Sequence, residues 1–559
     1  MPPAPTILAF LFRSAKQHAD APAIWGVVED RLEPVTWSEL LGDVSRLAAA
    51  LRLANIEPGD RVATIADNRY EWIVADLGIL LARAVHVPIH TSLSGEQITY
   101  QLLHSGAKIA ILGGQDQAEK LAPYAERLAD ECRFFTIEPF KKMERHAPII
   151  ERLAELVAES VTAGASFDAA REAAKIVSGD LATIMYTSGT TGEPKGVMLS
   201  HGNLASNAWA TATSYDEPSD EMRLCLLPLS HIYGRTCDLY CWLARGTQMA
   251  LARSRETVLE DAQIVKPTVI NAVPYFYERV YRRLREQSVA DKPGVLKRVL
   301  GGRIRTCFSG GAALPQSVAK FFRQQQLALF DGYGLSEASP VVAISTRKAS
   351  REGTVGQPLT DVEVKIAPDG EVLTKGPHVM LGYWDDPQAT AAAMENGWLK
   401  TGDLGAIDDD GFLKITGRKK ELIVLSTGKN VAPTQIERLL VDSPLIALAL
   451  VLGDGRPFLS ALIAPDPERL RLEMRERGIH AFTRKGVLAH ARVRDLYRHE
   501  IARILKNCAR HEQIGAFTLI GRAFSLEQGE MTPKGSFRRE VIAENFAAEI
   551  EAMYREEKP

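Results

Sequence analysis

The sequence predicts an α/β protein whose large N-terminal domain consists of parallel-type sheets with helices. With 559 residues the chain is too long for one hydrophobic core, so two or more domains are expected. Helical and strand patterns alternate over residues 1–110, which is typical of βαβ units, in which helices join parallel strands. Short strand patterns separated by Pro-Asp-Gly and Asp-Asp-Gly turns over residues 353–416 predict a β-rich subdomain.

Local signals define the first elements. Residues 36–39, Thr-Trp-Ser-Glu, form a capping box that predicts a helix to about residue 53. The elements expected after it are a strand over 61–65, a helix over 68–84, a strand over 85–88, a helix that begins near 92–96 and ends near 106, and a strand over 107–112. Residues 112–178 carry only weak signals.

The composition is that of a soluble globular protein, with 46% hydrophobic and 25% charged residues. The 67 basic and 70 acidic residues give a net charge of −3, so no overall field would attract nucleic acid. The six cysteines contain no CxxC pair, and we interpret them as reduced core thiols of a cytoplasmic protein. No window of 18 uncharged apolar residues is present, so no membrane span is expected. Peripheral membrane contact and the oligomeric state stay open.

The candidate phosphate loop is the stretch 186–196, YTSGTTGEPKG. It follows a predicted buried strand over 181–185 and precedes a helix predicted to begin at His201. Glycines let the backbone approach a ligand closely, consecutive turn amides form a concavity of donors for phosphate oxygens, and hydroxyls and a lysine add donors and charge. The spacing is not that of the P-loop, and the alternative is a solvated hairpin. The candidate residues are Thr187, Ser188, Gly189, Thr190, Thr191, Gly192 and Lys195.

Later stretches present polar groups after apolar runs. The run before His231 is predicted as a strand whose end presents that side chain, and the strand that ends near residue 309 is followed by a glycine turn, Gly310, Gly311 and Ala312. A flat ring beside glycines can stack on a base, and carboxylates can accept from an exocyclic amine or hold Mg²⁺. The alternative is a turn capped by tyrosine with a surface glutamate. The residues concerned are Asp331, Gly332, Tyr333, Gly334, Ser336 and Glu337, followed by Asp403 in a Thr-Gly-Asp turn.

In their order along the chain, the phosphate loop and these stretches resemble the motifs of the adenylate-forming superfamily, which contains acyl-CoA synthetases, luciferases and adenylation domains. The resemblance covers nearly the whole chain. It implies that ATP and a carboxylic acid give an acyl-adenylate and pyrophosphate, after which a thiol takes the acyl group. Residues 264–283 resemble the corresponding segment of long-chain acyl-CoA synthetases, which favours a medium- or long-chain fatty acid.

The resemblance also implies a role for each residue. The phosphate loop would hold the β- and γ-phosphates, and the glycine turn at Gly310 would lie against the adenine. His231 would line the acyl pocket. The remaining roles are Mg²⁺ for Thr187 and Glu337, adenosine for Asp331, Tyr333 and Asp403, and the phosphate and ribose for Arg418.

The resemblance further implies two domains that move. Residues 1–416 would form the AMP-binding domain and residues 418–559 a small mobile α+β domain, with a hinge near 417–418 and Gly417 as the favoured pivot. One orientation would form the adenylate. The other would bring a glycine loop, Ser426, Thr427, Gly428 and Lys429, to the thiol tunnel.

Near the C-terminus the sequence departs from the family pattern. Aligning Thr532-Pro533 and Arg538-Arg539 with long-chain relatives places Ser536 where the adenylating lysine belongs. Loss of one such preorganised donor costs about 10²–10³ in rate. Our hypothesis is that Lys534, two residues earlier and on the same face of an extended chain, replaces it. The alternative is that Lys534 is a solvated loop residue and adenylation is slow or lost.

Three functions are therefore weighed. The first is an acyl-CoA synthetase that uses ATP, Mg²⁺ and CoA. The second is a fatty acyl-AMP ligase that passes its product to the phosphopantetheine of a carrier protein. The third, motivated by Ser536, is a non-catalytic protein that binds nucleotide or acyl groups. The sequence does not set the length of the acyl chain.

Overall fold

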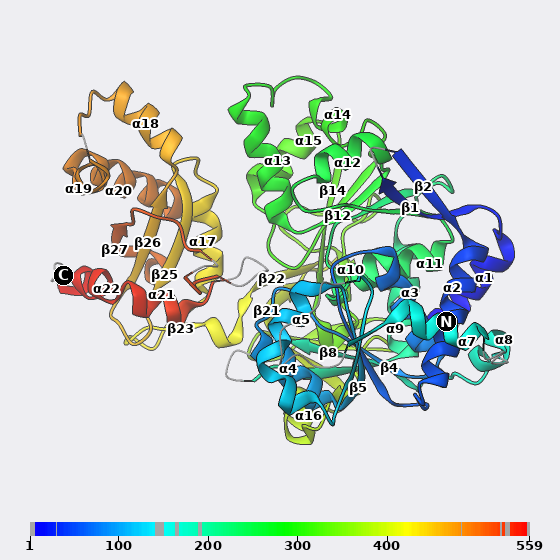
Figure 1. The fold of residues 1–559 in the computed structure, drawn as a ribbon. Helices are drawn as coiled ribbons and strands as arrows, with labels where there is room; N and C mark the ends of the chain where they lie inside the picture. Colours follow the sequence, from blue (N-terminus) through cyan, green and yellow to red (C-terminus); the bar gives the residue numbers. More distant parts are fainter. Residues whose placement is uncertain are drawn as a thin grey trace.

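The computed structural model of the protein describes residues 6–28, 31–139, 150–162, 167–187, 193–481, 483–525, 528–531 and 537–555. Two large sheets and the helices on their faces form the N-terminal part, and a smaller C-terminal part lies to one side of it (Figure 1). This arrangement confirms the predicted α/β class.

The first sheet is mainly parallel. Its strands lie in the order β19 (Gly382–Tyr383), β9 (Lys195–Ser200), β8 (Leu181–Thr187), β4 (Val85–Pro88), β3 (Arg61–Ile65), β5 (Ala107–Leu112), β6 (Arg133–Thr136) and β7 (Ile150–Arg152). The pairs from β8 to β7 are parallel, whereas β9 runs antiparallel to both β8 and β19.

The second sheet is also mainly parallel. Its order is β16 (Gln357–Pro358), β15 (Val341–Ile344), β14 (Ala328–Gly334), β13 (Thr306–Ser309), β12 (Val269–Ala272), β10 (Met222–Cys225), β11 (Gln248–Leu251), β1 (Pro22–Val28) and β2 (Arg31–Thr36). Only the pairs at its two ends, β16–β15–β14 and β1–β2, are antiparallel.

A shared layer of helices packs between the two sheets. Its apolar residues form one continuous core with strands of both sheets, while other helices cover the outer faces. The inner layer contains α1 (Ile7–Gln17), α2 (Trp37–Leu53), α3 (Tyr70–Leu81), α9 (His201–Ser214), α10 (Ile232–Gly234), a π-helix (Arg235–Tyr240) and α11 (Cys241–Arg245). The outer helices are α4 (Gly95–Ser105), α5 (Gln115–Leu121) and α6 (Ala125–Leu128) on one side and α12 (Val258–Val265), α13 (Pro274–Glu286), α14 (Val295–Val299) and α15 (Gln316–Gln324) on the other; α7 (Leu153–Thr162) and α8 (Ala169–Ala173) follow β7.

The early elements confirm the local sequence signals. Thr36 and Glu39 exchange the two hydrogen bonds of a capping box at the start of α2, and Ser94 and Gln97 do the same for α4. Each box satisfies amides that a helix start leaves without an intrahelical partner.

Two predictions about local structure are wrong. Residues 226–231 are not a strand, because the side chain of Asn68 binds the backbone of Leu227 (2.7 Å) and Leu229 (2.8 Å), and the strand β10 already ends at Cys225. The predicted order of strand, phosphate loop and helix omits a strand. The chain leaves β8, returns antiparallel as β9 and only then begins α9, which Ser200 caps.

The β-rich subdomain is confirmed. Its sheet runs in the order β17 (Glu363–Ile366), β18 (Glu371–Lys375), β21 (Trp398–Ile407) and β20 (Met394–Glu395), and β22 (Leu413–Arg418) pairs with β21. The helix α16 (Pro387–Ala393) connects β19 to β20.

The C-terminal part has its own core. It begins with the hairpin β23 (Ile423–Val424) and β24 (Asn430–Val431) and contains a sheet of β25 (Ile446–Leu452), β26 (Leu459–Pro465) and β27 (Ile514–Leu519). Its helices are α17 (Pro433–Val441), α18 (Pro467–Glu476), α19 (Arg484–Ala489), α20 (Ala491–Leu505), α21 (Arg539–Asn545) and α22 (Ala547–Arg555). The amide of Gln316, which begins α15, donates to Oδ1 of Asp442 at the end of α17 (3.2 Å) and thus links the two parts.

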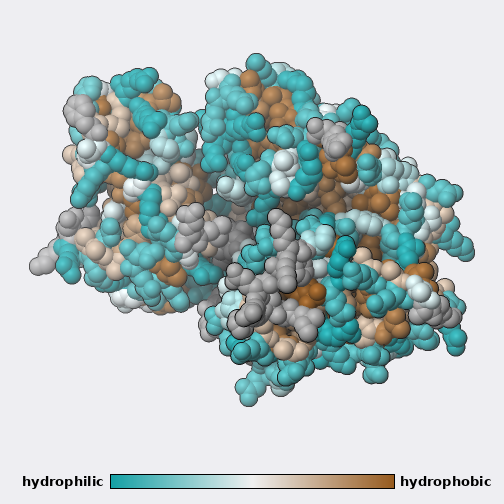
Figure 2. Space-filling model, in the orientation of Figure 1, coloured by the Kyte–Doolittle hydropathy of each residue, from teal (hydrophilic) through white to brown (hydrophobic). Residues whose placement is uncertain are grey.

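The surface seen in Figure 2 is mainly hydrophilic, with smaller apolar patches. Among the described residues, no helix has the length and apolar character that crossing a membrane requires.

Candidate active site

Tyr333 and Asp403 lie together at the centre of the candidate site. Tyr333 is on β14 and Asp403 on β21, and the hydroxyl of Tyr333 donates to Oδ2 of Asp403 (2.7 Å). Burial raises the pKa of the Asp403 carboxyl, although Arg418 opposes this. Burial also raises the pKa of Tyr333 well above its ordinary value, so the phenol keeps its proton. Two of the three predicted adenosine residues are therefore in direct contact.

Arg418 completes this cluster. It stands directly opposite Asp403 in the β21–β22 register, and its Nε lies 3.1 Å from Oδ1 of Asp403. The carboxylate is almost fully buried, whereas 59% of the Arg418 side chain is exposed. The guanidinium therefore keeps N–H donors that can reach an anion outside the cluster.

Asp331 shares a face of β14 with Tyr333, because the two are separated by one residue along a strand. Burial raises the pKa of Asp331 to about 7, and the charge of Arg438 on α17 acts in the opposite direction. The neighbouring strand β13 pairs with β14 at Ser309 and Asp331 and ends immediately before Gly310. The glycine turn at Gly310 and the carboxylate-bearing Asp331 of β14 thus lie on or directly after neighbouring strands.

The glycine turn is shaped by an aromatic neighbour that the sequence did not single out. A Cβ on Gly310 would lie 3.0 Å from the ring of Tyr233, so only glycine fits against this ring without displacement. Gly311 has a φ of +82°, a conformation that favours glycine. Ala312 follows as an exposed residue.

His231 begins the short helix α10. Its Nδ1 accepts from the amide of Tyr233 (3.2 Å), which caps the helix. The ring of Tyr233 packs against Gly310. His231 therefore precedes by two positions in sequence the residue that contacts the glycine turn.

The two stems of the phosphate loop meet at the end of β8 and the start of β9. Thr187 and Lys195 stand opposite each other in that register. Lys195 lies with its Nζ 3.7 Å from Asp386 and 5.1 Å from the ring centre of Tyr383. Five residues between the stems are outside the described part of the chain, as are Lys534 and Ser536; the five are Ser188, Gly189, Thr190, Thr191 and Gly192.

Glu337 is connected to the same region through Tyr383. The Tyr383 hydroxyl donates to Oε1 of Glu337 (3.0 Å). Gly332 and Gly334 lie on β14, and Ser336 begins the single turn that carries Glu337. Tyr383 was not predicted; its signal in the sequence is a Gly-Tyr-Trp triplet after an apolar run.

The predicted thiol-acceptor loop is a turn between β23 and β24. Ser426, Thr427, Gly428 and Lys429 are exposed, and Gly428 has a φ of +76°. Within the described ranges, no hydrogen bond or ion pair joins this loop to the cluster of Tyr333, Asp403 and Arg418.

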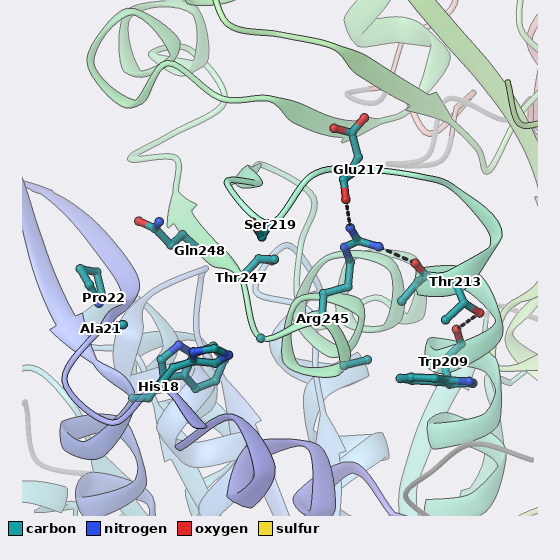
Figure 3. Close-up of a pocket in the computed structure, with 14 residues that line it drawn as sticks. His18, Ala21, Pro22, Trp209, Thr213, Glu217, Ser219, Arg245, Thr247 and Gln248 are labelled. Atoms are coloured by element: carbon teal, nitrogen blue, oxygen red, sulfur yellow. Dashed lines mark hydrogen bonds between the residues drawn. The ribbon is translucent and has the colours of Figure 1, made fainter. Parts of the chain in front are cut away.

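A half-open cavity of about 530 Å³ lies elsewhere, between the ends of α1 and α9 and the turn after α11 (Figure 3). None of the predicted site residues lines it. Arg245, which lines this cavity, donates to the carbonyls of Ala212 (2.8 Å) and Glu217 (2.6 Å) and pairs with Glu221 (2.8 Å). These contacts engage all three of its nitrogens, so we do not place the active site here.

The fold and the cluster define a class of protein in which a large α/β part carries the candidate site next to a small C-terminal part. Comparison with known proteins agrees. The profile of the AMP-binding enzyme family matches residues 11–384, and that of the AMP-binding enzyme C-terminal domain matches residues 420–558. The chain belongs to the AMP-binding enzyme family of the adenylate-forming superfamily, which confirms the resemblance stated above.

Two curated relatives match nearly the whole of this chain. The chain is 34% identical to the "Long-chain-fatty-acid--CoA ligase FadD15" of Mycobacterium bovis, over 99% of this chain and 97% of the relative. It is 27% identical to the "Long-chain-fatty-acid--[acyl-carrier-protein] ligase AEE15, chloroplastic" of Arabidopsis thaliana, over 97% of this chain and 85% of the relative.

Solved structures share the fold. The anthranilate CoA ligase AuaEII in complex with anthranoyl-AMP superposes with a TM-score of 0.78 at 19% identity, over 98% of both chains. The adenylation domain of a carboxylate reductase from Mycobacterium chelonae gives a TM-score of 0.77 at 22% identity, over 99% of this chain and 92% of that one.

Proposed function

We propose that the protein is an AMP-forming acid–thiol ligase that activates a medium- or long-chain fatty acid with ATP and transfers the acyl group to CoA. The observation that carries this proposal is the convergence of Tyr333, Asp403 and Arg418 from β14, β21 and β22. The similarity to FadD15 over 99% of the chain supports the acid and the acceptor.

The residues of the cluster suit an adenosine. Asp403 is a buried carboxylate that is already oriented by Tyr333 and Arg418, and a carboxylate can accept from both ribose hydroxyls. Asp331 can accept from the exocyclic amine of adenine. The turn at Gly310 packs closely against the ring of Tyr233, and its glycines would let the backbone approach the adenine.

The residues present also fit Mg²⁺. This ion is held in enzymes by one or two carboxylates together with phosphates and waters, and not by a dedicated protein cage. In the part of the chain that the structure describes, no group of three or more His, Cys, Asp or Glu side chains could hold a metal. Glu337 and the hydroxyl of Thr187 would be its protein ligands, and the ion would neutralise phosphate charge.

The reaction has two steps. A carboxylate oxygen attacks the α-phosphorus of ATP, the bond to the β-phosphate oxygen breaks, and pyrophosphate leaves. A thiolate then attacks the acyl carbon and AMP leaves. Arg418, with its exposed guanidinium, would stabilise the α-phosphate in the first step, and Lys195 would hold the outer phosphates.

We place the domain boundary and the hinge near residues 417–418. A Cβ on Gly417 would lie 3.1 Å from Cβ of Ala432, so the chain after the hinge passes close to this glycine. Lys419, two residues further on, binds Asp369 (2.6 Å) and Glu371 (2.8 Å) of the β-rich subdomain. Rotation of the C-terminal domain would have to break these ion pairs or carry them along.

A carrier protein is the second candidate acceptor. AEE15, which is named as an acyl-carrier-protein ligase, matches 97% of this chain. CoA and a carrier protein present the same phosphopantetheine thiol, so one tunnel could serve both.

Pyrophosphate release distinguishes the candidates. ATP, Mg²⁺ and a panel of fatty acids of graded length would be supplied with CoA, with a carrier protein or with neither. Sustained pyrophosphate release with CoA supports the proposal. Sustained release only with the carrier protein supports the acyl-AMP ligase that loads a carrier. No pyrophosphate with any acid contradicts both and favours a binding protein.

Lys534 is tested separately. Ser536 stands where relatives have the adenylating lysine. If Lys534 takes over the role of that lysine, Lys534→Ala reduces the rate of acyl-AMP formation by about 10²–10³ and leaves thioester formation from preformed acyl-AMP unchanged. Unchanged adenylation rejects this role.

A further inference from the structure

The segment 380–386 forms a strap between Glu337 and the strand that follows the phosphate loop. The amide of Met380 donates to the carbonyl of Glu337 (2.9 Å). The amides of Leu381 and Trp384 donate to the carbonyls of Met198 (2.9 Å) and Gly196 (2.7 Å). The strap therefore fixes the distance between two elements that are far apart in the sequence.

Tyr383 lies in the middle of this strap and contacts Glu337 and Lys195, which the proposed function places near the phosphates. Its hydroxyl donates to Oε1 of Glu337 (3.0 Å), and its ring centre is 5.1 Å from Nζ of Lys195. Its own amide donates to Oγ1 of Thr390 (2.8 Å), which anchors the backbone at this point. The half-buried side chain of Tyr383 thus contacts the Glu337 carboxylate with its hydroxyl and the Lys195 ammonium group with the face of its ring.

We propose that Tyr383 is a positioning residue that orients the Glu337 carboxylate toward the magnesium nucleotide and steadies Lys195 for its phosphates. This inference rests on the proposed function. A glutamate and a lysine each lose considerable rotamer freedom when they are held in one place. The hydrogen bond to Oε1 fixes the carboxylate and leaves Oε2 for another ligand. The ring attracts the ammonium group through its negative face.

Tyr383→Phe and Tyr383→Leu separate the two contacts. Phenylalanine keeps the ring and removes the hydroxyl, whereas leucine removes both. The measurement is calorimetric binding of the non-hydrolysable analogue α,β-methylene-ATP with and without Mg²⁺, which does not depend on turnover. We expect Tyr383→Phe to weaken binding about tenfold in Mg²⁺, the loss typical of a hydrogen bond to a charged group, and to leave metal-free binding unchanged. Tyr383→Leu should also weaken metal-free binding.

The matched control is Tyr281→Phe. Tyr281 lies on α13, where it stacks on Phe321, and this change should alter neither measurement. Binding of Mn²⁺ to the analogue complex, followed by electron paramagnetic resonance, gives a second readout. Glu337→Gln and the double variant complete a cycle, in which the loss from Tyr383→Phe should disappear once Glu337 is already altered.

The outcomes are distinguishable. If Glu337→Gln weakens binding in Mg²⁺ and Tyr383→Phe does not, or if the two effects simply add, the positioning role is overturned. If Glu337→Gln itself leaves metal-dependent binding unchanged, the proposed metal role of Glu337 fails, and the role of Tyr383 toward the ion fails with it. A Tyr383→Leu variant whose metal-free binding equals the wild type overturns the role toward Lys195.

Discussion

The hydroxyl of Tyr333 donates to the buried carboxylate of Asp403 at 2.7 Å, although the two residues are 70 positions apart. This hydrogen bond joins the second large sheet to the β-rich subdomain. Because Arg418 holds the other oxygen of Asp403, the carboxylate is fixed before any ligand arrives, which lowers the cost of ordering it on binding.

The first prediction concerns this carboxylate. Asp403→Asn removes the charge that would accept from the ribose, and we expect the affinity for ATP to fall about 10- to 100-fold, the range for hydrogen bonds to a charged group. Tyr333→Phe should cost less, and the two effects should not add, because the residues are in contact. Calorimetric titration with ATP measures both. Asp410→Asn, which alters an exposed carboxylate paired with Arg351, is the control. An unaltered affinity for ATP in Asp403→Asn would contradict the assignment of Asp403 to the ribose.

The second prediction concerns pH and Asp331. Burial raises its pKa in the folded state to about 7, well above the ordinary value for an aspartate. The folded protein therefore binds this proton more tightly than the unfolded chain does. The contribution to stability is complete below about pH 4 and is lost as the pH rises through about 7.

Asp331→Asn cannot titrate, so its stability relative to the wild type should rise between about pH 4 and about pH 7 and then level off. Urea unfolding at a series of pH values measures this difference. A difference that is constant across the range would contradict the raised pKa.

The third prediction concerns the contact between Gly310 and Tyr233. A Cβ at residue 310 would lie 3.0 Å from the ring, so Gly310→Ala must displace the ring or the turn. We expect the KM for ATP or for the acid to rise at least about tenfold, since small misplacements at a reacting site are costly. Gly179→Ala is the control, because no atom lies within 4 Å of the added carbon there. Equal kinetics for the two variants would refute the prediction.

The fourth prediction concerns a fully buried ion pair between Arg235 of the π-helix and Asp76 of α3. Burial lowers the pKa of His86, which also contacts Asp76, to about 4. His86 is therefore neutral at pH 7, and Arg235 balances the charge of Asp76. Arg235 additionally donates to Thr183 of β8 (2.7 Å).

Arg235→Met should leave a buried charge without compensation and lower the free energy of unfolding by about 3–5 kcal/mol. Arg323→Met is the matched control. Its partner is Glu352, both side chains are 57% exposed, and the expected loss is about 0–1 kcal/mol. Denaturant titration measures both, and equal losses would show that Asp76 does not depend on Arg235.

Much of the fold could be predicted because its signals are local. The capping boxes at Thr36 and Ser94 and the strands at residues 61–65 and 107–112 involve groups within a few residues of one another. The order of the glycine turns and carboxylates along the chain was likewise sufficient to identify the family.

Three features could not be predicted in this way. The segment before His231 is held out of a strand by Asn68, which is 159 residues from Leu227 in sequence. The strand β9 pairs with β8, which precedes it in the chain, and with β19, which comes much later in the chain. The second pairing leaves no signal near β9 in the sequence. Tyr383 joins Glu337, 46 residues away, to Lys195.

The sequence by itself determined the α/β class, the helix starts and the set of residues suited to a nucleotide, because propensity, capping and side-chain chemistry are properties of short segments. Only the tertiary structure decided which of those residues meet. The pairing of Tyr333 with Asp403 and the strap through Tyr383 depend on sheets that assemble from distant strands, and no local pattern records which strands will be neighbours.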